Sequence, residues 1–331
     1  MNHKFIVTPT IKLIVKIIIT IVLIYILLAR TDIETIKQII PKTNFYLFSL
    51  ASVVFFARNI FAAWRWHVLL KAKYYDVSIG RLTRLYFIGY FFSFFLPTVV
   101  GGDIARGYYL YSDGVSKKEA ISSIVIERVL GVLAMTLFAL FSVLFWFSII
   151  NSDLIKIIVI VPSIIFLIFL LLFYYGKIGL SSKLQDGTAR KLTSLIRLIH
   201  SLKSYGKRPD ILILAFLMSL LFQFFGVIAT YFIALSIQSN TEFIYFLMLL
   251  PIVWFVSLLP ISLNGLGVRE GTFVFLFVVI GMTKETAITI SGLFLLQTIA
   301  QGLLGGVFFL WDQEKIAAIK EYSTSSYKLF R

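Results

Sequence analysis

The sequence predicts an all-α polytopic membrane protein. Hydrophobic residues make up 59% of the 331 positions and charged residues only 14%, whereas soluble domains carry about 25% charged residues. Several apolar stretches reach the roughly 20 residues that a membrane-spanning helix needs. Lysine and arginine gather in a few segments between these stretches. Together these observations favour apolar spans joined by basic loops.

Six stretches are predicted as full membrane spans, namely 11–29, 44–63, 119–149, 155–175, 211–236 and 286–310. The first of them is longer than the apolar region of a typical signal peptide, and no small-residue cleavage site follows it, so no cleavable signal is expected. Two further apolar stretches, 85–111 and 243–281, are interrupted by proline and glycine.

Basic loops predict the orientation of the chain. The segments 64–84 and 177–208 are rich in lysine and arginine, and their only acids are Asp76 and Asp186. The positive-inside rule places both loops in the cytoplasm. The N-terminus and the tail 313–331 are also basic. We therefore expect both termini to lie in the cytoplasm.

This orientation bears on the two interrupted stretches. The stretch 85–111 is expected to enter from the cytoplasmic face and return to it, and 243–281 does the same from the outer loop 237–242. The simplest topology is six full spans plus two opposed re-entrant hairpins, in repeats at 85–149 and 243–310. Such broken, inverted repeats are typical of transporters. Eight full spans are the alternative, because hydropathy alone does not exclude them.

The cytoplasmic loop 177–210 has a pattern of its own. Apolar residues recur at helical spacing from Leu192 to Leu202, with basic residues between them. One interpretation is an amphipathic helix that lies on the inner membrane surface. The other is a solvated linker helix packed on its neighbours.

The interrupted stretches share one motif, P-x4-G-x3-R, which runs from Pro97 to Arg106 and again from Pro260 to Arg269. Proline breaks the hydrogen-bond ladder of a helix. An arginine at the membrane centre costs about 2.5–3.5 kcal/mol on insertion scales. Because the same costly set occurs twice, the pair of motifs is the best indication of function in this sequence.

The first motif predicts an anion site. Pro97 ends one helix, and Gly101 and Gly102 allow a turn. A second helix then starts near Asp103, which is expected to cap it. Exposed N–H groups at such a start attract anions, and the planar fork of Arg106 suits a phosphate.

The second motif repeats this arrangement on the opposite side. Asn264, Gly265 and Gly267 form the turn, and Arg269 and Glu270 follow it. Two helix starts and two arginines predict a two-sided site for a phospholipid phosphate. In the alternative interpretation, Arg106 pairs with Asp103 and Arg269 with Glu270 only to stabilise the broken helices.

Two further ionisable residues, Glu127 and Arg128, lie within the apolar span 119–149. Intramembrane charges are functional candidates, so Glu127 is expected to pair with Arg106 or Arg269, or to carry a proton. If the helix begins late, both residues lie near the inner headgroups instead.

Other polar residues interrupt the spans. Arg58 is expected to extend to the interface, beside the interfacial Arg65. Gln297 and Gln301 share a helix face, and they either line a cavity or form hydrogen bonds between helices.

The sequence contains no enzyme signature. It has no P-loop, no nucleophile elbow and no metal-ligand cluster, and it contains no cysteine and only three histidines. No catalytic residue, cofactor or metal is predicted. Topology and anionic headgroups explain the net charge of +15, so no nucleic-acid partner is expected.

The motifs resemble the flippase-like membrane region of lysylphosphatidylglycerol synthases over about residues 10–312. The resemblance rests on the runs Arg65–Leu70, Phe95–Arg106, Ile126–Gly131 and Leu259–Gly271. It implies a flippase-like transmembrane domain, 1–312, with opposed repeats. In the full synthases this region moves aminoacylated phosphatidylglycerol to the outer leaflet, and a separate soluble domain makes that lipid. We expect this chain, which ends at Arg331, to lack the soluble domain.

Motifs and resemblance together predict a translocase for an anionic phospholipid or a lipid-linked headgroup in the cytoplasmic membrane of a prokaryote. A separate lipid-modifying enzyme is a candidate partner. The expected headgroup ligands are Arg106 and Arg269, with Asp103, Glu127 and Glu270 orienting them or coupling transport to an ion. The full set of expected substrate-binding residues also includes Arg128 and Asn264. Two alternatives stay open. One is a scaffold that presents lipid to a partner enzyme, and the other is a membrane-embedded transferase acting on polyprenyl-phosphate sugars.

Overall fold

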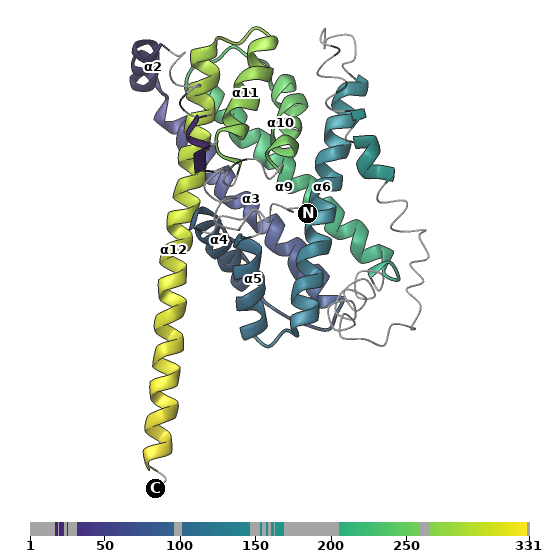
Figure 1. Cartoon of the computed structure of the whole chain (residues 1–331), viewed down its shortest axis with the longest axis vertical. Coiled ribbons are helices and arrows are strands. Elements are labelled where there is room, and N and C mark those ends of the chain that lie inside the picture. The colour runs from purple at the N-terminus through teal and green to yellow at the C-terminus, as the bar shows by residue number, and fades with distance from the viewer. Residues whose placement is uncertain are drawn as a thin grey trace, which may run out of the picture.

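The computed structural model describes residues 32–95, 101–145, 205–258 and 265–329, together with Ser262 and scattered residues between 17 and 25 and between 153 and 168. Every regular element in these ranges is a helix, and Figure 1 shows their arrangement. The predicted all-α class is therefore confirmed for the described part of the chain.

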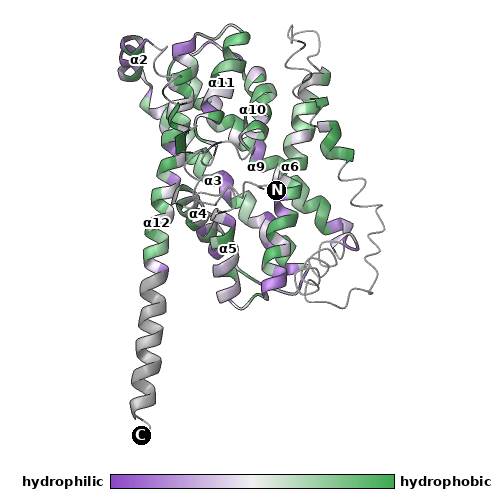
Figure 2. Ribbon diagram, viewed as in Figure 1, coloured by the Kyte–Doolittle hydropathy of each residue, from purple (hydrophilic) through white to green (hydrophobic). Residues whose placement is uncertain are grey.

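Among the described residues, four helices are long and apolar enough to cross a membrane. They are α3 (Phe45–Lys71), α6 (Lys117–Phe145), α9 (Pro209–Ser236) and α12 (Lys284–Leu329), of which α12 is apolar up to Asp312. Figure 2 shows apolar residues along much of their length. These helices match the predicted spans 44–63, 119–149, 211–236 and 286–310. The predicted spans 11–29 and 155–175 lie largely outside the described residues, as does the loop 177–210 up to residue 204.

Local sequence explains where these helices begin. Asn44 precedes α3, and its side chain accepts a hydrogen bond from the backbone N–H of Leu47 at 3.2 Å, which is the usual role of an N-cap residue. Pro209 starts α9, where its missing N–H costs no hydrogen bond. The short helices α2 (Ile33–Ile39) and η1 (Ile40–Lys42) precede α3.

Four shorter helices form two pairs. The first hairpin consists of α4 (Ile79–Phe95) and α5 (Gly101–Ser112), and the second of α10 (Phe243–Ser257) and α11 (Val268–Val279). At the open end of the first hairpin, Nε of Arg81 lies 2.8 Å from a carboxylate oxygen of Asp113. At the open end of the second, the rings of Phe246 and Phe277 lie 4.8 Å apart. Each pair therefore begins and ends on the same side.

The two hairpins lie in opposite halves of the helix bundle, beyond which α12 extends (Figure 1). The open end of the first adjoins the end of α3, where the hydroxyl of Tyr75 accepts a hydrogen bond from the N–H of Ser116 at 3.3 Å. The open end of the second adjoins the end of α9. There the carbonyl of Ser236 accepts from the N–H of Asn44 at 2.7 Å, at the start of α3.

Helix packing links the two halves. The central pair is α3 with α9, α12 packs against α4, and α10 packs against α6. Each hairpin thus contacts the long helix that follows the other hairpin. Glycines make the α4–α12 contact close, since a Cβ atom at Gly305 would overlap the backbone carbonyl of Phe87. Close approach through small residues is a common way to pair helices in membranes.

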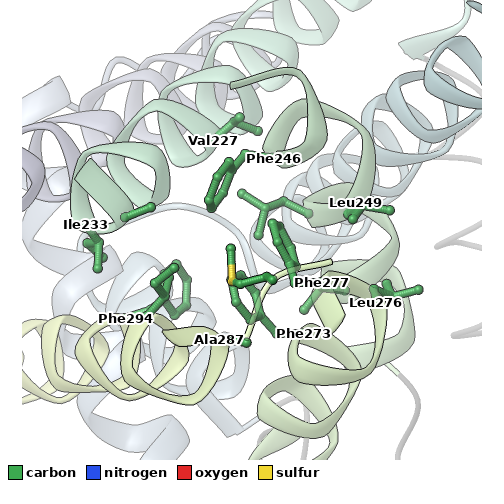
Figure 3. Packing of buried hydrophobic residues seen from close by; sticks show 14 of the residues in the cluster. Val227, Ile233, Phe246, Leu249, Phe273, Leu276, Phe277, Ala287 and Phe294 are labelled. Carbon is green, nitrogen blue, oxygen red and sulfur yellow. The ribbon is translucent and has the colours of Figure 1, made fainter. Parts of the chain in front are cut away.

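Aromatic residues fill the apolar core of the second half. Figure 3 shows a cluster of side chains that includes Phe246, Phe273, Phe277 and Phe294. The rings of Phe273 and Phe277 stack at 4.1 Å. A second cluster surrounds Trp66 and joins α3, α4, α5 and α6. These clusters fix the helices that carry the polar residues described next.

Candidate functional site

A cavity of about 470 Å³ lies among helices of both halves, and its lining includes residues of both hairpins. Its volume is in the range of about 300–1,000 Å³ that is usual for small-molecule sites. Five arginines line it, namely Arg58, Arg65, Arg106, Arg128 and Arg269. Asp103 and Glu127 are the carboxylates in the described lining.

Glycines position Arg106 in the first hairpin. A Cβ atom at Gly102 would overlap the carbonyl of Gly89 and the hydroxyl of Ser93, so α5 lies directly against α4. The side chain of Arg106 packs on Gly89, where its Cγ atom lies 3.0 Å from the position a Cβ would take. The guanidinium lies over the ring of Tyr86, 4.3 Å from its centre. This packing leaves Arg106 only 6% exposed.

Glu127 of α6 joins two of the arginines. Its carboxylate accepts from Arg65 at 2.6 Å and from Arg106 at 3.3 Å, and the hydroxyl of Tyr86 donates to it as well. Glu127 is 3% exposed. A buried charge is stable only when oppositely charged or hydrogen-bonding groups surround it, and this carboxylate has three such donors.

Asp103 extends the network, because both Arg106 and Arg128 donate to it. The resulting chain alternates in charge and contains Arg65, Glu127, Arg106, Asp103 and Arg128. The expected capping role of Asp103 is wrong. Helix α5 begins at Gly101, so Asp103 lies within the first turn and its carboxylate holds two arginines.

Arg269 lies in the first turn of α11. Its guanidinium donates to Glu270 at 2.6 Å and 2.9 Å, and Glu270 also accepts from the N–H of Gly267 at 2.7 Å. Gly265 and Gly267 have φ of +75° and +79°, a region that strongly favours glycine. The turn expected here is therefore built on these two glycines. The carboxylate of Glu270 connects this turn to Arg269 because it accepts hydrogen bonds from both Gly267 and Arg269.

The two halves of the site share a local arrangement at the ends of α4 and α10. The hydroxyl of Ser93 donates to the carbonyl of Gly89 at 2.9 Å, and that of Ser257 to the carbonyl of Val253 at 2.6 Å. Both serines line the cavity. Each also faces a motif glycine, since a Cβ at Gly265 would lie 3.3 Å from the Cβ of Ser257.

The structure brings most of the predicted site residues together. The cavity lining contains Arg106, Arg269, Asp103, Glu127 and Arg128, and Glu270 binds Arg269 behind it. The local ion pairs of the alternative interpretation, Arg106 with Asp103 and Arg269 with Glu270, are also present. Pro97, Pro260 and Asn264 lie outside the described residues. Glu127 pairs with Arg106 rather than with Arg269.

Sequence reasoning misplaced two arginines of α3. Arg58 and Arg65 were expected at the membrane interface, but they are 8% and 6% exposed and line the cavity. A signal was available, because residues seven apart in a helix lie on one face. That face also carries Phe55, Ala62 and Leu69, all of which are buried.

The glutamines form hydrogen bonds between helices. Gln297 donates to the hydroxyl of Ser52 at 3.1 Å, and Gln301 donates to the carbonyl of Phe55 at 3.0 Å. Gln301 also lines the cavity, together with Gln223. Gln301 therefore both lines the cavity and forms a hydrogen bond between helices, as the two interpretations of the sequence proposed separately.

Comparison with known proteins adds the family. Residues 13–306 match the family described as the lysylphosphatidylglycerol synthase TM region. The chain is 24% identical over 328 residues to the UPF0104 membrane protein PH1989 of Pyrococcus horikoshii. The aligned region covers 91% of this chain and 98% of that protein.

A second relative, the UPF0104 membrane protein MJ1595 of Methanocaldococcus jannaschii, is 27% identical over 129 residues, which is 38% of each chain. No solved structure matches. The family match covers both motifs and every arginine that lines the cavity. This chain therefore belongs to the lysylphosphatidylglycerol synthase TM region family of membrane proteins.

Proposed function

We propose that this membrane protein is a lipid translocase that binds an anionic phospholipid, or an anionic lipid-linked headgroup, between its two hairpins. One observation carries the proposal. Arg106 of the first motif and Arg269 of the second come from opposite hairpins and line the same cavity. A duplicated motif whose two arginines meet in one site suits a headgroup that both halves handle in turn.

The arrangement of the hairpins supports opposed, inverted repeats. Each hairpin starts and finishes on one side, the two lie in opposite halves of the helix bundle (Figure 1), and each packs on the long helix that follows the other. If both hairpins are re-entrant segments, the first hairpin opens to the cytoplasm and the second hairpin opens to the outside. Both termini then lie in the cytoplasm. Broken helices that meet near the membrane midplane are a recurrent basis of alternating access.

The chemistry of the lining supports an anionic headgroup. A phosphate that leaves the interface loses its hydration, and in hydrocarbon this costs many kcal/mol. Arginine guanidinium groups replace part of that hydration with charge-assisted hydrogen bonds in a planar fork. Because the cavity holds five arginines and two lining carboxylates, it lowers the barrier for an anion. The acyl chains need no such site and stay in the bilayer.

The same lining favours translocation over sugar transfer. A membrane-embedded transferase needs a carboxylate free to act as a base or to hold a metal. Here Asp103 accepts from two arginines, and Glu127 accepts from two arginines and a tyrosine. Both carboxylates thus serve to hold arginines. A separate enzyme would supply the modified lipid.

Vesicle reconstitution tests this function. The purified full chain is inserted into vesicles that contain fluorescent phosphatidylglycerol, phosphatidic acid or a polyprenyl phosphate, and leaflet exchange is measured by quenching from outside. We expect the native chain to speed exchange of at least one of these lipids. Arg269→Gln slows it roughly tenfold or more, because a hydrogen bond to a charged group contributes about 1.5–3 kcal/mol.

Two further variants make the test specific. Arg106→Lys keeps the charge but removes the fork, so we expect slower exchange with a folded protein. Arg84 serves as the matched control, because it lies over the ring of Trp311 at 5.2 Å and is absent from the cavity lining. Arg84→Gln should exchange lipid at the native rate. Equal exchange with and without protein for all three lipids would sink the proposal.

A further inference from the structure

Arg58 stands apart from the other arginines of the cavity. It lies midway along α3 and is 8% exposed. It forms no ion pair with any described residue, and its Nε atom has no hydrogen-bond partner there. Its guanidinium lies between two rings, 4.2 Å from the centre of Phe55 and 4.7 Å from that of Phe222.

The ring contacts do not balance the cost of burying this charge. Cation–π contacts contribute about 0.5–2 kcal/mol each, whereas burial of an unpaired ion costs several kcal/mol. A helix that needed only packing at this position would carry an apolar side chain. An unneutralised arginine in the wall of a cavity is instead suited to a negatively charged ligand.

Neighbouring helices make room for this guanidinium. Gly226 of α9 has no side chain, and a Cβ atom there would meet the guanidinium of Arg58 and lie 2.9 Å from the ring of Trp254. The hydroxyl of Tyr90 donates to Asn59 at 2.8 Å. Tyr90 also lines the cavity, and a neutral hydroxyl does not neutralise the charge of Arg58. Arg269 lines the same cavity as Arg58.

The charges around the cavity indicate the kind of anion. Among the described residues, five arginines line the wall, and the carboxylates that lie among them or bind them are Asp103, Glu127 and Glu270. The arginines thus exceed these carboxylates by two. A phosphodiester carries one negative charge, whereas a terminal phosphate carries about 1.5 to 2 at neutral pH. The charge of a terminal phosphate therefore matches the excess of two positive charges.

We propose that Arg58, together with Arg269, binds the headgroup phosphate, and that the site prefers a lipid with a terminal phosphate to a phosphodiester lipid. This inference rests on the proposed function only for the location of the headgroup site. It adds Arg58 of α3, which lies outside both motifs, as a ligand of the headgroup. It also names the substrate class, lipids with a terminal phosphate. Phosphatidic acid and polyprenyl phosphates share the required chemistry.

Equilibrium binding tests the preference without any transport step. The full chain in nanodiscs is titrated with short-chain phosphatidic acid, phosphatidylglycerol and phosphatidylcholine at pH 8. We expect phosphatidic acid to bind roughly tenfold more tightly than phosphatidylglycerol. Arg58→Met weakens the binding of phosphatidic acid by roughly ten- to a hundredfold, since it removes hydrogen bonds to a charged group. It also abolishes the preference for phosphatidic acid over phosphatidylglycerol. Arg58→Lys is intermediate, and the control Arg84→Met binds like the native chain.

Thermal unfolding without added lipid separates a ligand from a packing residue. Methionine has a flexible apolar side chain that fills irregular gaps, and it removes an unpaired buried charge. Arg58→Met should therefore raise the melting midpoint while it weakens binding. A lower midpoint would assign Arg58 to packing and overturn the inference. Equal native affinity for the two anionic lipids, or an unchanged preference in Arg58→Met, would overturn it too.

The outcomes distinguish this inference from the proposed function. If phosphatidic acid binds selectively through Arg58 but no lipid exchanges between leaflets, translocation is wrong and the Arg58 site stands. If lipid exchanges between leaflets and Arg58→Met keeps the native selectivity, translocation stands and the Arg58 site is wrong.

Discussion

Glu127 shows how one residue stabilises the site. It is the carboxylate on which Arg65 and Arg106 converge, at 2.6 Å and 3.3 Å, and the Tyr86 hydroxyl donates to it as well. Loss of one partner from a buried ion pair leaves the other charge uncompensated. Such losses cost about 3–5 kcal/mol. The native position of both arginines therefore depends on the charge of this residue.

We expect Glu127→Gln to lower the stability of the protein by a few kcal/mol, because the amide leaves Arg65 and Arg106 without their shared negative charge. Thermal unfolding of the purified protein in detergent measures the effect. Glu119 is the matched control, since it lies in the first turn of the same helix and pairs with Lys73 and Lys118 at 3.7 Å. Glu119→Gln should cost less than Glu127→Gln, because both ion pairs of Glu119 are longer, at 3.7 Å, and the Lys118 side chain is exposed. Equal losses for the two variants would contradict this account.

At the scale of the helices, close contacts through glycine fix the position of the first hairpin. Helices α5 and α12 both lie directly on α4, and Gly102 and Gly305 allow these contacts. In both cases the atom that a Cβ would meet belongs to the backbone. A backbone cannot rotate away as a side chain can, so the helices themselves would have to move.

We expect Gly305→Ala to destabilise the protein by about 1–3 kcal/mol, the usual range for overpacking. Gly292 lies on the same helix, and nothing lies within 4 Å of the position a Cβ would take there. Gly292→Ala should be neutral or stabilise by up to about 1 kcal/mol, because alanine favours helix over glycine. Chemical denaturation in mixed micelles compares the two. A stable Gly305→Ala protein would mean that α12 and α4 are not in contact at this point.

At the scale of the whole molecule, the basic loops predict the orientation of the two hairpins in the membrane. The chain contains no cysteine, so single cysteines report the side on which each loop lies. Asp76 lies between α3 and α4, Asn240 lies between α9 and α10, and both are exposed. They adjoin the open ends of the first and the second hairpin.

We expect Asp76→Cys to react with a membrane-impermeant maleimide only from the cytoplasmic side, and Asn240→Cys only from the outside. Intact cells and inverted vesicles give the two sides. The physical reason is the excess of lysine and arginine in the segment 64–84 and its absence from 237–242. Labelling of both cysteines from one side would exclude opposed hairpins.

Much of the fold was predictable from the sequence. Apolar length and composition indicated the helices α3, α6, α9 and α12, since a membrane-spanning helix must satisfy its own backbone and present an apolar surface. The spaced motifs indicated the family. Because a proline–glycine–arginine set is costly in a bilayer, its repetition pointed to Arg106 and Arg269. Both of these residues line the cavity.

The tertiary structure decided what those residues face. Helical spacing places Arg58 and Arg65 on one face of α3, but spacing does not say whether lipid, water or another helix covers that face. Packing against α9 and the first hairpin made it an interior face, so two arginines expected at the interface line the cavity. Ion pairing was likewise undecided, because Glu127 and Arg106 are 21 residues apart in sequence and only folding brings their charges together.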